Sequence, residues 1–402
     1  MFDRATDTDL FPAGHLPVRV FSEARLHRAA DGTVHAADHS SGAAAWDVYV
    51  ERLGAVELAA RVGPVDASGG VPVGRIEVRP MPFYSGPRQL VRRLPSVVAA
   101  ALAATAGASI CVFRLPGTVG LLSGAWCRLR GRRYAVEVVG DPASVLRSGV
   151  LGAAGRHLAP AAAGLMRWVV AGAAAGRYVT ESTLQRLYPL APGALEHHYS
   201  NVRLAEEDFT ATPRPIRPVR RLLAVGSHDQ LYKGHDDLIR AVALLAGRGI
   251  RVDLGLVGDG RHNALLRNLA RTTGVADRVT FHGRVTDRAE LRRLLDEADL
   301  FCTPSRTEGL PRALIEAMAR GLPAMGTDVG GIRELLDRPF RAPPSDPAAL
   351  AALIAAFVAG TVDSGEASRT VWERAQRFGP CQQAERIQRW LDDVQALART
   401  SS

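Results

Sequence analysis

Lysine is almost absent from this chain: lysine and arginine together number 50, yet Lys233 is the only lysine. Cysteine is also scarce, and the four cysteines, Cys111, Cys127, Cys302 and Cys381, lie far apart without a CxxC pair. This spacing argues against a zinc site and against a disulfide framework. It fits a protein of the reducing cytoplasm.

Targeting signals are also missing from the sequence pattern. Residues 1–10 are acidic and polar, where a secretion signal would be basic and then apolar. The longest uncharged run, residues 94–113, is interrupted by Gly107 and ends in β-branched residues. It predicts a buried helix followed by a buried strand rather than a membrane span. We therefore expect a cytoplasmic protein, which could also lie peripherally at the inner membrane face.

Length and charge narrow the class of protein further. A chain of 402 residues with 47% hydrophobic residues is long enough for two domains, each with its own core. The formal charge of +9 divides almost evenly, with +4 in residues 1–212 and +5 beyond. An even spread without any nucleic-acid-binding motif favours an anionic small ligand or a membrane surface, and not a nucleic acid.

The second half of the chain alternates between short apolar strands and amphipathic helices. The expected strands are residues 222–227, 252–258, 279–283, 299–305 and 323–328, and the expected helices between them are 235–249, 262–274, 287–298 and 310–321. This rhythm predicts a parallel sheet with helices on both faces. Its ligand site should lie at the carboxyl ends of the strands, in the loops that contain Gly226, Gly258, Gly283, Ser305 and Thr327.

The first half shows the same rhythm less clearly. Strands are expected at residues 18–22, 56–62, 74–80, 108–115, 133–140 and 176–182. We therefore expect a first domain over residues 1–210, a proline-rich linker over 211–218 and a second domain over 219–375. The amphipathic pattern within 376–402 predicts a C-terminal helix that braces the first domain.

Lys233 lies in the sequence LYKGH, after a strand and its loop and before a helix. A compact ammonium can meet a phosphate oxygen in a confined site where a planar guanidinium would not fit. Gly234 leaves the following helix N-terminus open to an anion. The alternative is the chance survival of one lysine in an arginine-rich chain.

Two carboxylates follow the strand at 299–305. Glu308 falls in the loop and Glu316 in the next helix, so both could face one ligand at different depths. Glu316 could bind ribose hydroxyls while Glu308 lies near a sugar. The alternative for Glu316 is a surface pair with Arg312 at i, i+4 spacing.

Glycines mark the other loops: Gly258 and Gly260 flank Asp259, Gly283 ends a strand, and Gly330 and Gly331 precede a helix. Each lets a ligand approach the main chain closely, although each is also compatible with an ordinary turn.

Taken in order, VGSHDQLYKG, LVGDG, FHG and PSRTEGLPRALIEAMARGLPAMGTDVGGIREL resemble the C-terminal domain of family 4 glycosyltransferases, which have the GT-B fold. The resemblance spans residues 222–336, where an E-x7-E element lies in its expected loop-helix setting with four other motifs in register. Over the first half it rests on architecture and on the Asn201–Val202 pair.

The resemblance implies an α/β protein of two facing Rossmann-like domains with a cleft between them. The acceptor would bind to the first domain, and a nucleoside-diphosphate sugar to the second, with retention of anomeric configuration and without a metal or other cofactor. Lys233 would contact the diphosphate, Glu316 the ribose and Glu308 the sugar. The donor site implied in this way contains Ser227, Lys233, Gly234, Gly258, Gly260, Arg261, Gly283, Arg284, Arg306, Gly309, Leu310 and Glu316; the catalytic set is Glu308, Lys233 and Asp141.

Two positions depart from the family pattern. Ser227 stands where many members carry an arginine as a second phosphate cation, so Arg306 or Arg261 would have to supply that charge. Asp141 stands near the place of a histidine in the first domain. It could orient the donor sugar or the acceptor hydroxyl, or it could simply cap the helix that follows.

Several functional alternatives remain at this level. A DxD-like pair, Asp7 and Asp9, is a weak candidate for a metal site. An epimerase or hydrolase would need acid and base residues beyond Asp141 and Glu181, and a non-catalytic nucleotide-sugar sensor would not need both Glu308 and Glu316.

The acceptor is expected to be a growing glycan of exopolysaccharide or capsule assembly, lipid-linked or free, with a soluble aglycone or aminocyclitol as the alternative. Two basic clusters could meet anionic lipid, or could be solvated helix ends. The clusters are Arg88, Arg92 and Arg93, and Arg128, Arg130, Arg132 and Arg133.

Overall fold

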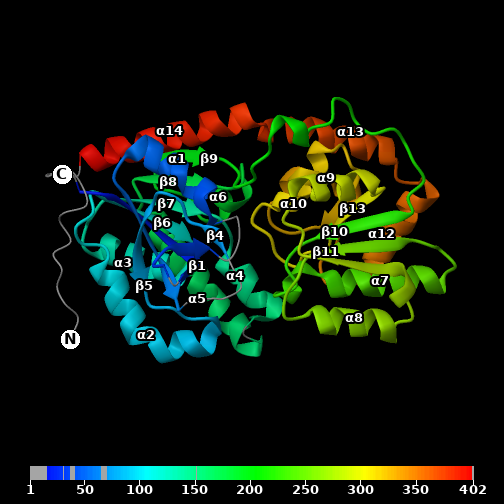
Figure 1. Cartoon of the computed structure of the whole chain (residues 1–402), viewed down its shortest axis with the longest axis horizontal. Coiled ribbons are helices and arrows are strands. Elements are labelled where there is room, and N and C mark those ends of the chain that lie inside the picture. Colours follow the sequence, from blue (N-terminus) through cyan, green and yellow to red (C-terminus); the bar gives the residue numbers. More distant parts are fainter. Residues whose placement is uncertain (1–15, 30, 37–40, 65–69, 151, 401–402) are drawn as a thin grey trace. The chain divides into compact units, whose positions relative to one another are not determined.

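The computed structural model describes residues 16–29, 31–36, 41–64, 70–150 and 152–400. They form two compact units, seen in Figure 1. Unit 1 comprises residues 1–143, 157–199 and 385–402, and unit 2 comprises residues 144–156 and 200–384, in each case as far as they are described.

Unit 1 is built on a nine-stranded sheet in which β5, β3, β1, β6, β7, β8 and β9 are parallel neighbours in that order, while β2 pairs antiparallel with β1 and β4. The strands are β1 (Val18–Arg28), β2 (Val34–Ala36), β3 (Val56–Gly63), β4 (Val71–Pro72), β5 (Glu77–Met81), β6 (Ile110–Leu115), β7 (Tyr134–Val138), β8 (Ala175–Tyr178) and β9 (Leu195–His198). The six strands expected from the sequence are all present. The unpredicted strands β2, β4 and β9 are short.

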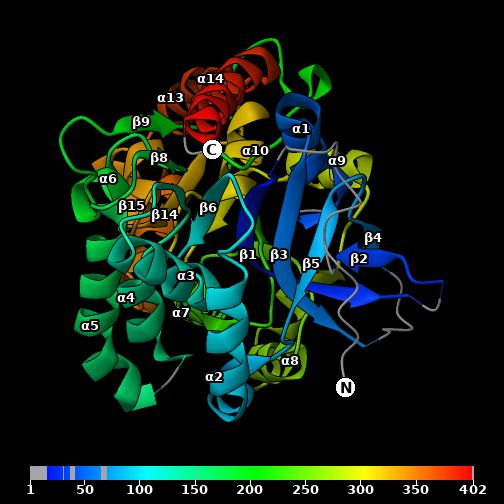
Figure 2. The same ribbon diagram turned by 90° about the vertical axis from the view of Figure 1, so that its left-hand side faces the viewer.

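The helices of unit 1 cover both faces of this sheet. They are α1 (Ala43–Leu53), α2 (Gly86–Ala103), α3 (Thr118–Leu129), α4 (Pro142–Val145), α5 (Gly152–Val170) and α6 (Thr183–Leu187). Figures 1 and 2 show α2, α3 and α5 side by side on one face of the sheet, with α1 on the other. Strands such as β7 are buried along their whole length, so the helices on both faces of the sheet cover its side chains.

A buried ionic network crosses the sheet of unit 1. Glu137 of β7 accepts hydrogen bonds from Arg177 at 3.0 Å, from Arg114 at 2.9 Å and from the Tyr49 hydroxyl. Burial alone would raise the pKa of Glu137, but Arg177 and Arg114 lower it to about 2. The carboxylate therefore stays ionised in the core, where each charge has a partner.

Unit 2 has a six-stranded, fully parallel sheet in the order β12-β11-β10-β13-β14-β15. Its strands are β10 (Arg221–Val225), β11 (Asp253–Val257), β12 (Val279–Gly283), β13 (Leu300–Thr303), β14 (Ala324–Thr327) and β15 (Arg341–Ala342). Its helices are α7 (His235–Gly247), α8 (Asn263–Thr272), α9 (Arg288–Glu297), α10 (Arg312–Ala319), α11 (Ile332–Leu335), α12 (Pro347–Ala359) and α13 (Ser364–Ala375). The fold expected for this half is confirmed, with α7 and α8 on one side of the strands and α9 and α10 on the other (Figure 1).

The division between the units falls earlier than the proline-rich segment at 211–218. Residues from Ser200 onward belong to unit 2, because Asp208 pairs with Arg292 at 2.9 Å and Arg214 donates to carbonyl groups around Asp296. Residues 144–156 also belong to unit 2. The proline-rich segment is thus anchored along unit 2 and is not a free linker.

The C-terminal helix α14 (Pro380–Arg399) contributes its residues from Glu385 onward to unit 1. Trp390, Leu391 and Val394 are fully buried in the same core cluster as Trp46 of α1. The side chain of His197 on β9 pairs with Asp393 at 2.7 Å. Residues 385–399 therefore form part of the core of unit 1.

The uncharged run at 94–113 folds as the end of α2 followed by β6, but its helix is not wholly buried. Leu94 is 42% exposed, and the first buried residue of α2 is Val97. The expectation of a fully buried helix is therefore wrong for the start of this run, because α2 begins at Gly86, before the part of the helix that packs on the sheet.

Within the described residues, no single helix has both the length and the apolar content needed to cross a membrane. Only the bent pair formed by residues 347–359 and 364–378 meets that test, by length and composition alone.

Candidate active site

Loops leave the carboxyl ends of the unit 2 strands along one edge of the sheet, and backbone hydrogen bonds join neighbouring loops. Gly226 N donates to Val257 O at 2.9 Å, and Gly258 N donates to Gly283 O at 2.8 Å. The loops after β10, β11 and β12 are therefore held side by side. This is the edge at which parallel sheets bind their ligands.

The loop after β10 ends in a short 3-10 turn, Leu231–Lys233, and then at Gly234. Gly234 has φ of 72°, and a Cβ at this position would lie 2.0 Å from Pro304 O. Only glycine fits that backbone and that contact. Helix α7 begins directly afterwards at His235, so its N-terminus opens at this loop.

Lys233 is paired with Glu308, which lies in the loop after β13. Its Nζ donates a hydrogen bond to Glu308 Oε1 at 2.7 Å, and the two side chains are 24% and 10% exposed. Burial by itself would lower the pKa of Lys233, but the Glu308 carboxylate and Tyr232 raise it above its ordinary value. The ammonium is therefore charged, and the structure joins two residues that the sequence analysis had selected separately.

Glu308 is held from several sides. Ser305 Oγ donates to the same Oε1 atom at 2.7 Å, and Thr327 Oγ1 of β14 donates to Ser305 O. A Cβ on Gly330, whose φ is 45°, would lie 1.9 Å from Glu308 O. The loop after β14 thus packs directly against the Glu308 backbone, and this packing fixes the carboxylate beside Lys233.

The segment after Glu308 leads into α10. Gly309 O accepts a hydrogen bond from Gly331 N at 2.8 Å, and Leu310 lies partly buried beside it. Glu316 lies in the second turn of α10 and is partly buried. Burial raises the pKa of Glu316, with smaller opposing effects of Arg312 and Arg288.

The alternative role for Glu316, a surface ion pair with Arg312, is absent from the described structure. The Arg312 side chain is exposed, and neither a hydrogen bond nor an ion pair of its guanidinium occurs among the described residues. It nevertheless lies close enough to influence the pKa of both Lys233 and Glu316. Arg312 is therefore an uncommitted cation beside the two residues of interest.

The two arginines expected to replace the missing phosphate cation are engaged elsewhere. Arg306 binds the carboxylates of Asp236 and Asp237 at 2.8 and 2.7 Å. Arg261 Nε donates to Asp229 O at 2.9 Å. Ser227 is exposed and its Oγ accepts from Asp229 N at 3.2 Å. Arg306 in particular is bound by its acidic partners in the first turn of α7, which sequence spacing does not reveal.

The remaining predicted donor residues lie in the same set of loops. Gly260 lies against Asp229, since a Cβ there would fall 2.3 Å from Asp229 N, and Gly258 lies against Gly226 in the same way at 1.9 Å from its carbonyl oxygen. Gly283 ends β12 with open space around it, and the Arg284 side chain that follows is exposed. The loops after β10, β11 and β12 thus form one connected surface.

Asp141 lies in unit 1, directly before α4. Its Oδ1 accepts hydrogen bonds from Ala143 N at 2.9 Å and from the Tyr188 hydroxyl. These contacts match the helix-cap role that the sequence left open, and they occupy an oxygen that a sugar hydroxyl would otherwise meet.

Two histidines at this edge were not predicted. His228 and His235 are buried and meet edge to face, with ring centroids 4.9 Å apart. Burial, His228 and Lys233 lower the pKa of His235 to about 3, so it stays neutral next to the ammonium. The only sequence signal was their place on either side of LYKG, which is compatible with many roles.

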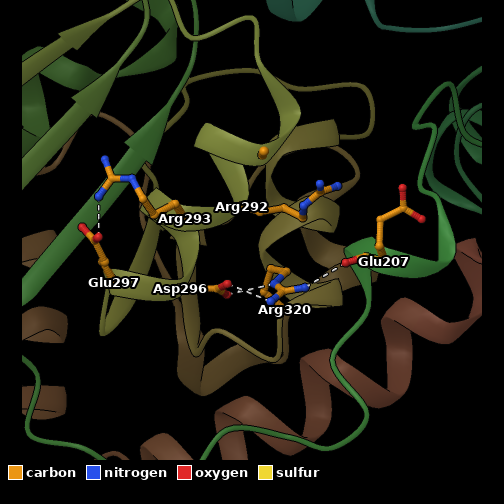
Figure 3. A pocket seen from close by; sticks show the side chains of 7 residues that line it. Glu207, Arg292, Arg293, Asp296, Glu297 and Arg320 are labelled. Atoms are coloured by element: carbon orange, nitrogen blue, oxygen red, sulfur yellow. Dashed lines mark hydrogen bonds and ion pairs between the residues drawn. The ribbon is translucent and has the colours of Figure 1, made fainter.

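A separate hollow of about 420 Å³ lies along α9 (Figure 3). Most of its charged side chains are paired: Arg320 pairs with Asp296 at 2.7 Å, and Arg293 pairs with Glu297. Asp296 and Glu297 end α9 just before β13, at the amino edge of the sheet. The hollow is therefore remote from the carboxyl-edge loops that carry the candidate site.

The DxD-like pair Asp7 and Asp9 lies outside the described residues. Among the described residues, no group of three or more histidine, cysteine, aspartate or glutamate side chains is arranged to hold a metal ion.

Residues 219–359 match the family model of glycosyl transferases group 1. Over 282 residues the chain is 26% identical to protein CapJ of Staphylococcus aureus, an alignment that covers 70% of each chain. Over 140 residues it is 35% identical to the amylovoran biosynthesis glycosyltransferase AmsK of Erwinia amylovora, which covers 33% of this chain and 34% of AmsK.

Solved structures agree at the level of the fold. The complex of Anabaena HepE with UDP-glucose matches with a TM-score of 0.64 at 16% identity, covering 94% of this chain and 100% of HepE. The architecture is therefore that of the two-domain GT-B glycosyltransferases. The family match itself is confined to residues 219–359, which lie in unit 2, so this part of the chain is similar to glycosyl transferases group 1 in the region where its motifs indicated the resemblance.

Proposed function

We propose that this protein is a retaining glycosyltransferase that moves a hexose-type sugar from a nucleoside-diphosphate sugar to an acceptor hydroxyl. The pairing of Lys233 with Glu308 at the carboxyl edge of the unit 2 sheet supports this proposal most strongly. It places a cation suited to a diphosphate next to a carboxylate suited to a sugar. The HepE structure, which holds UDP-glucose on the same fold, supports the donor class.

In this proposal, Lys233 meets the donor diphosphate. Its ammonium lies next to the N-terminus of α7, where backbone N–H groups favour an anion. The diphosphate would share the ammonium with Glu308, because Lys233 has three N–H donors. Gly309 and Leu310 would add main-chain donors from the loop before α10.

Glu316 holds the ribose hydroxyls. Its partly buried carboxylate has no hydrogen-bond donor among the described residues, so two hydroxyl groups would satisfy it. The base then lies toward the Gly283–Arg284 loop, where the exposed guanidinium can stack on it or bind its edge.

Arg312 is the best candidate for the second phosphate cation, in place of Arg306 or Arg261. It is the first residue of α10, a position at which the helix dipole disfavours a cation unless an anion is near. A bound diphosphate would supply that anion. Arg312 lies close enough to influence the pKa of both Lys233, proposed to bind the diphosphate, and Glu316, proposed to bind the ribose of the same donor.

In the transfer step, the bond between the anomeric carbon and the diphosphate oxygen breaks, and the acceptor oxygen bonds to the same face of that carbon. The acceptor proton passes to the departing diphosphate oxygen. Lys233 and Arg312 stabilise the charge that develops on the leaving group. Glu308 stabilises the positive charge that develops on the sugar.

The acceptor is proposed to be a growing glycan of exopolysaccharide or capsule assembly, carried on a lipid. The similarity to AmsK, an amylovoran biosynthesis glycosyltransferase, supports a glycan polymer.

A direct test combines calorimetry with product analysis. Titration with a panel of nucleoside diphosphates should reveal one base with a clear preference, and NMR of the product should show the donor's anomeric configuration. EDTA should leave initial rates within about twofold, because the proposed charge partners are side chains and main-chain groups. An inverted product, or loss of activity in EDTA that Mg²⁺ restores, would contradict the mechanism. Absence of binding to every diphosphate would contradict the function itself.

A further inference from the structure

The first three turns of α2 stand out from unit 1 without apolar cover. Residues 91–96 are all exposed, and burial begins only at Val97. Val91 is 70% exposed and Leu94 is 42% exposed, while Leu90 is partly buried. A helix that only packs on a sheet would bury such side chains from its first turn.

The exposed apolar residues continue the buried stripe of the same helix. At 100° per residue, Leu90 and Leu94 fall on the side of α2 that also carries Val97 and Ala101, and Val91 lies at the edge of that side. Val97 and Ala101 are fully buried, whereas the described structure places nothing over Val91. The apolar face of α2 is therefore longer than the surface on which it packs.

Arginines flank this exposed stripe, and their charge is not compensated. Arg88 borders it on the side of Val91 and Arg93 borders it on the other side, while Arg92 lies on the far side of the helix. None of their guanidinium groups has a hydrogen bond or an ion pair among the described residues. The sequence has no aspartate or glutamate between Glu77 and Glu137. The local charge is therefore of one sign.

The position of this helix also matters. Because α2 follows β5, its first turns lie at the carboxyl edge of the unit 1 sheet, the edge at which parallel sheets bind ligands. Figure 2 shows α2 beside α3 on the same face. The exposed turns are thus next to the place where unit 1 would receive a ligand.

We propose that the α2 surface, defined as Arg88, Leu90, Val91, Arg92, Arg93 and Leu94, docks on an anionic lipid bilayer. An amphipathic segment of this kind lies in the bilayer interface, with its apolar stripe at the acyl boundary and its arginines on lipid phosphates. A polyanion such as a nucleic acid or an acidic glycan would match the arginines but would leave the stripe in water. The surface belongs to unit 1 alone and does not depend on the donor chemistry. Together with the proposed function, it would bring a lipid-borne acceptor to the enzyme.

The test is flotation of the full chain with vesicles of phosphatidylcholine alone and of phosphatidylcholine mixed with phosphatidylglycerol. We expect the protein to float only with the mixed vesicles, and less so at high salt, because salt screens the arginines. Replacing Arg88, Arg92 and Arg93 by Gln should lower partitioning by about fivefold per arginine. The double variant Val91→Ser, Leu94→Ser should lower it even at low salt.

Matched controls are available in unit 2. Leu244→Ser removes an apolar side chain that is 40% exposed, and Arg248→Gln removes an exposed charge, and neither should change flotation. Nucleoside diphosphate affinity, measured in the same α2 variants, should be unchanged, which separates this proposal from the donor site.

Four outcomes would overturn the proposal. The first is equal binding to both kinds of vesicle, or to neither. The second is flotation that survives the α2 substitutions. The third is arginine-dependent binding to dextran sulfate without any binding to vesicles, which would assign the surface to a soluble polyanion. Salt-independent self-association through Val91 and Leu94 would likewise overturn the proposal, because it would assign the surface to a second copy of the chain.

Discussion

Lys233 Nζ donates a hydrogen bond to Glu308 Oε1 at 2.7 Å, although the two residues are 75 positions apart in sequence. Each charge compensates the other before a donor binds, because the ammonium neutralises a carboxylate that is only 10% exposed. A donor diphosphate must therefore share a cation that already has a partner. The affinity of the site depends on how much of that pairing survives binding.

The first prediction concerns the carboxylate of this pair. Glu308→Gln keeps the shape and the contact with Ser305 but removes the negative charge that stabilises the transferred sugar. We expect kcat to fall by about 100-fold. Affinity for the free diphosphate should rise, by up to about tenfold, since Lys233 no longer has an anionic competitor. Initial rates with the full donor measure the fall in kcat, and calorimetry with the free diphosphate measures the change in affinity. Weaker diphosphate binding in Glu308→Gln would refute the proposal that Glu308 competes for Lys233.

The second prediction concerns the ammonium. Lys233→Met should weaken diphosphate binding by about 1.5–3 kcal/mol, the cost of a charge-assisted hydrogen bond. Lys233→Arg should recover little of this loss, because a planar guanidinium needs more room where the lysine stem passes Gly226. Near-normal turnover in Lys233→Arg would show that any cation suffices at this position.

The third prediction concerns Glu316 and pH. Burial raises its pKa above the ordinary 4.5, so the folded protein favours the protonated form and loses stability as pH rises through that range. Ribose binding needs the carboxylate, so donor affinity should fall as pH drops, beginning above 4.5. Glu316→Gln should bind the donor more weakly, lose this pH dependence and unfold at a higher temperature than the wild type at neutral pH. Calorimetry across pH and thermal unfolding test both consequences, and a destabilised variant would contradict the burial argument.

The fourth prediction tests Arg312 as the second phosphate cation. Arg312→Gln should weaken diphosphate binding by about tenfold, while the affinity for the unphosphorylated nucleoside stays the same. Arg306→Gln is the contrasting variant: its guanidinium is committed to Asp236 and Asp237, so its removal should lower stability more than affinity. If Arg306→Gln instead weakens diphosphate binding and Arg312→Gln does not, Arg306 is the second phosphate cation.

The fifth prediction uses two glycines with similar backbones. In Gly330→Ala, the new methyl group would fall 1.9 Å from Glu308 O, so the loop that holds Glu308 must move and kcat should drop with it. Gly274→Ala has φ of 73° but open space around it, so it should cost only about 1 kcal/mol of stability and leave kcat unchanged. Equal kinetics in both variants would show that the Gly330 contact does not position Glu308.

Much of the fold was predictable because buried parallel strands and amphipathic helices leave strong patterns in the sequence. The strands β10 to β14 were all found, since β10, β11, β13 and β14 are largely apolar runs and β12 alternates between apolar and polar residues. The strands β2 and β4 were missed because they are only 3 and 2 residues long, and β9 was missed because its sequence, LEHH, is mostly polar and not buried. The partners of Glu137 were equally hidden, since Arg177 and Tyr49 approach it only through the tertiary fold.

The candidate site was also predictable from the sequence only in part. Residue type and loop position selected Lys233 and Glu308, but the direct bond between them depends on how the loops after β10 and β13 meet. For the same reason the sequence did not reveal the ion pairs of Arg306, whose acidic partners Asp236 and Asp237 lie in a different element. The hydrogen bonds of Asp141 were anticipated only as one of two alternatives.

The rarity of lysine gives the Lys233 site a chemical identity of its own. Every other basic side chain of the described structure ends in a guanidinium or an imidazole, so a reagent selective for side-chain amines has a single target. With its pKa raised by Glu308, that amine should react sluggishly in the empty protein. A nucleotide bearing an aldehyde near its phosphates would be drawn to it, and one mass shift on one peptide would report occupancy of the site without any substrate turnover.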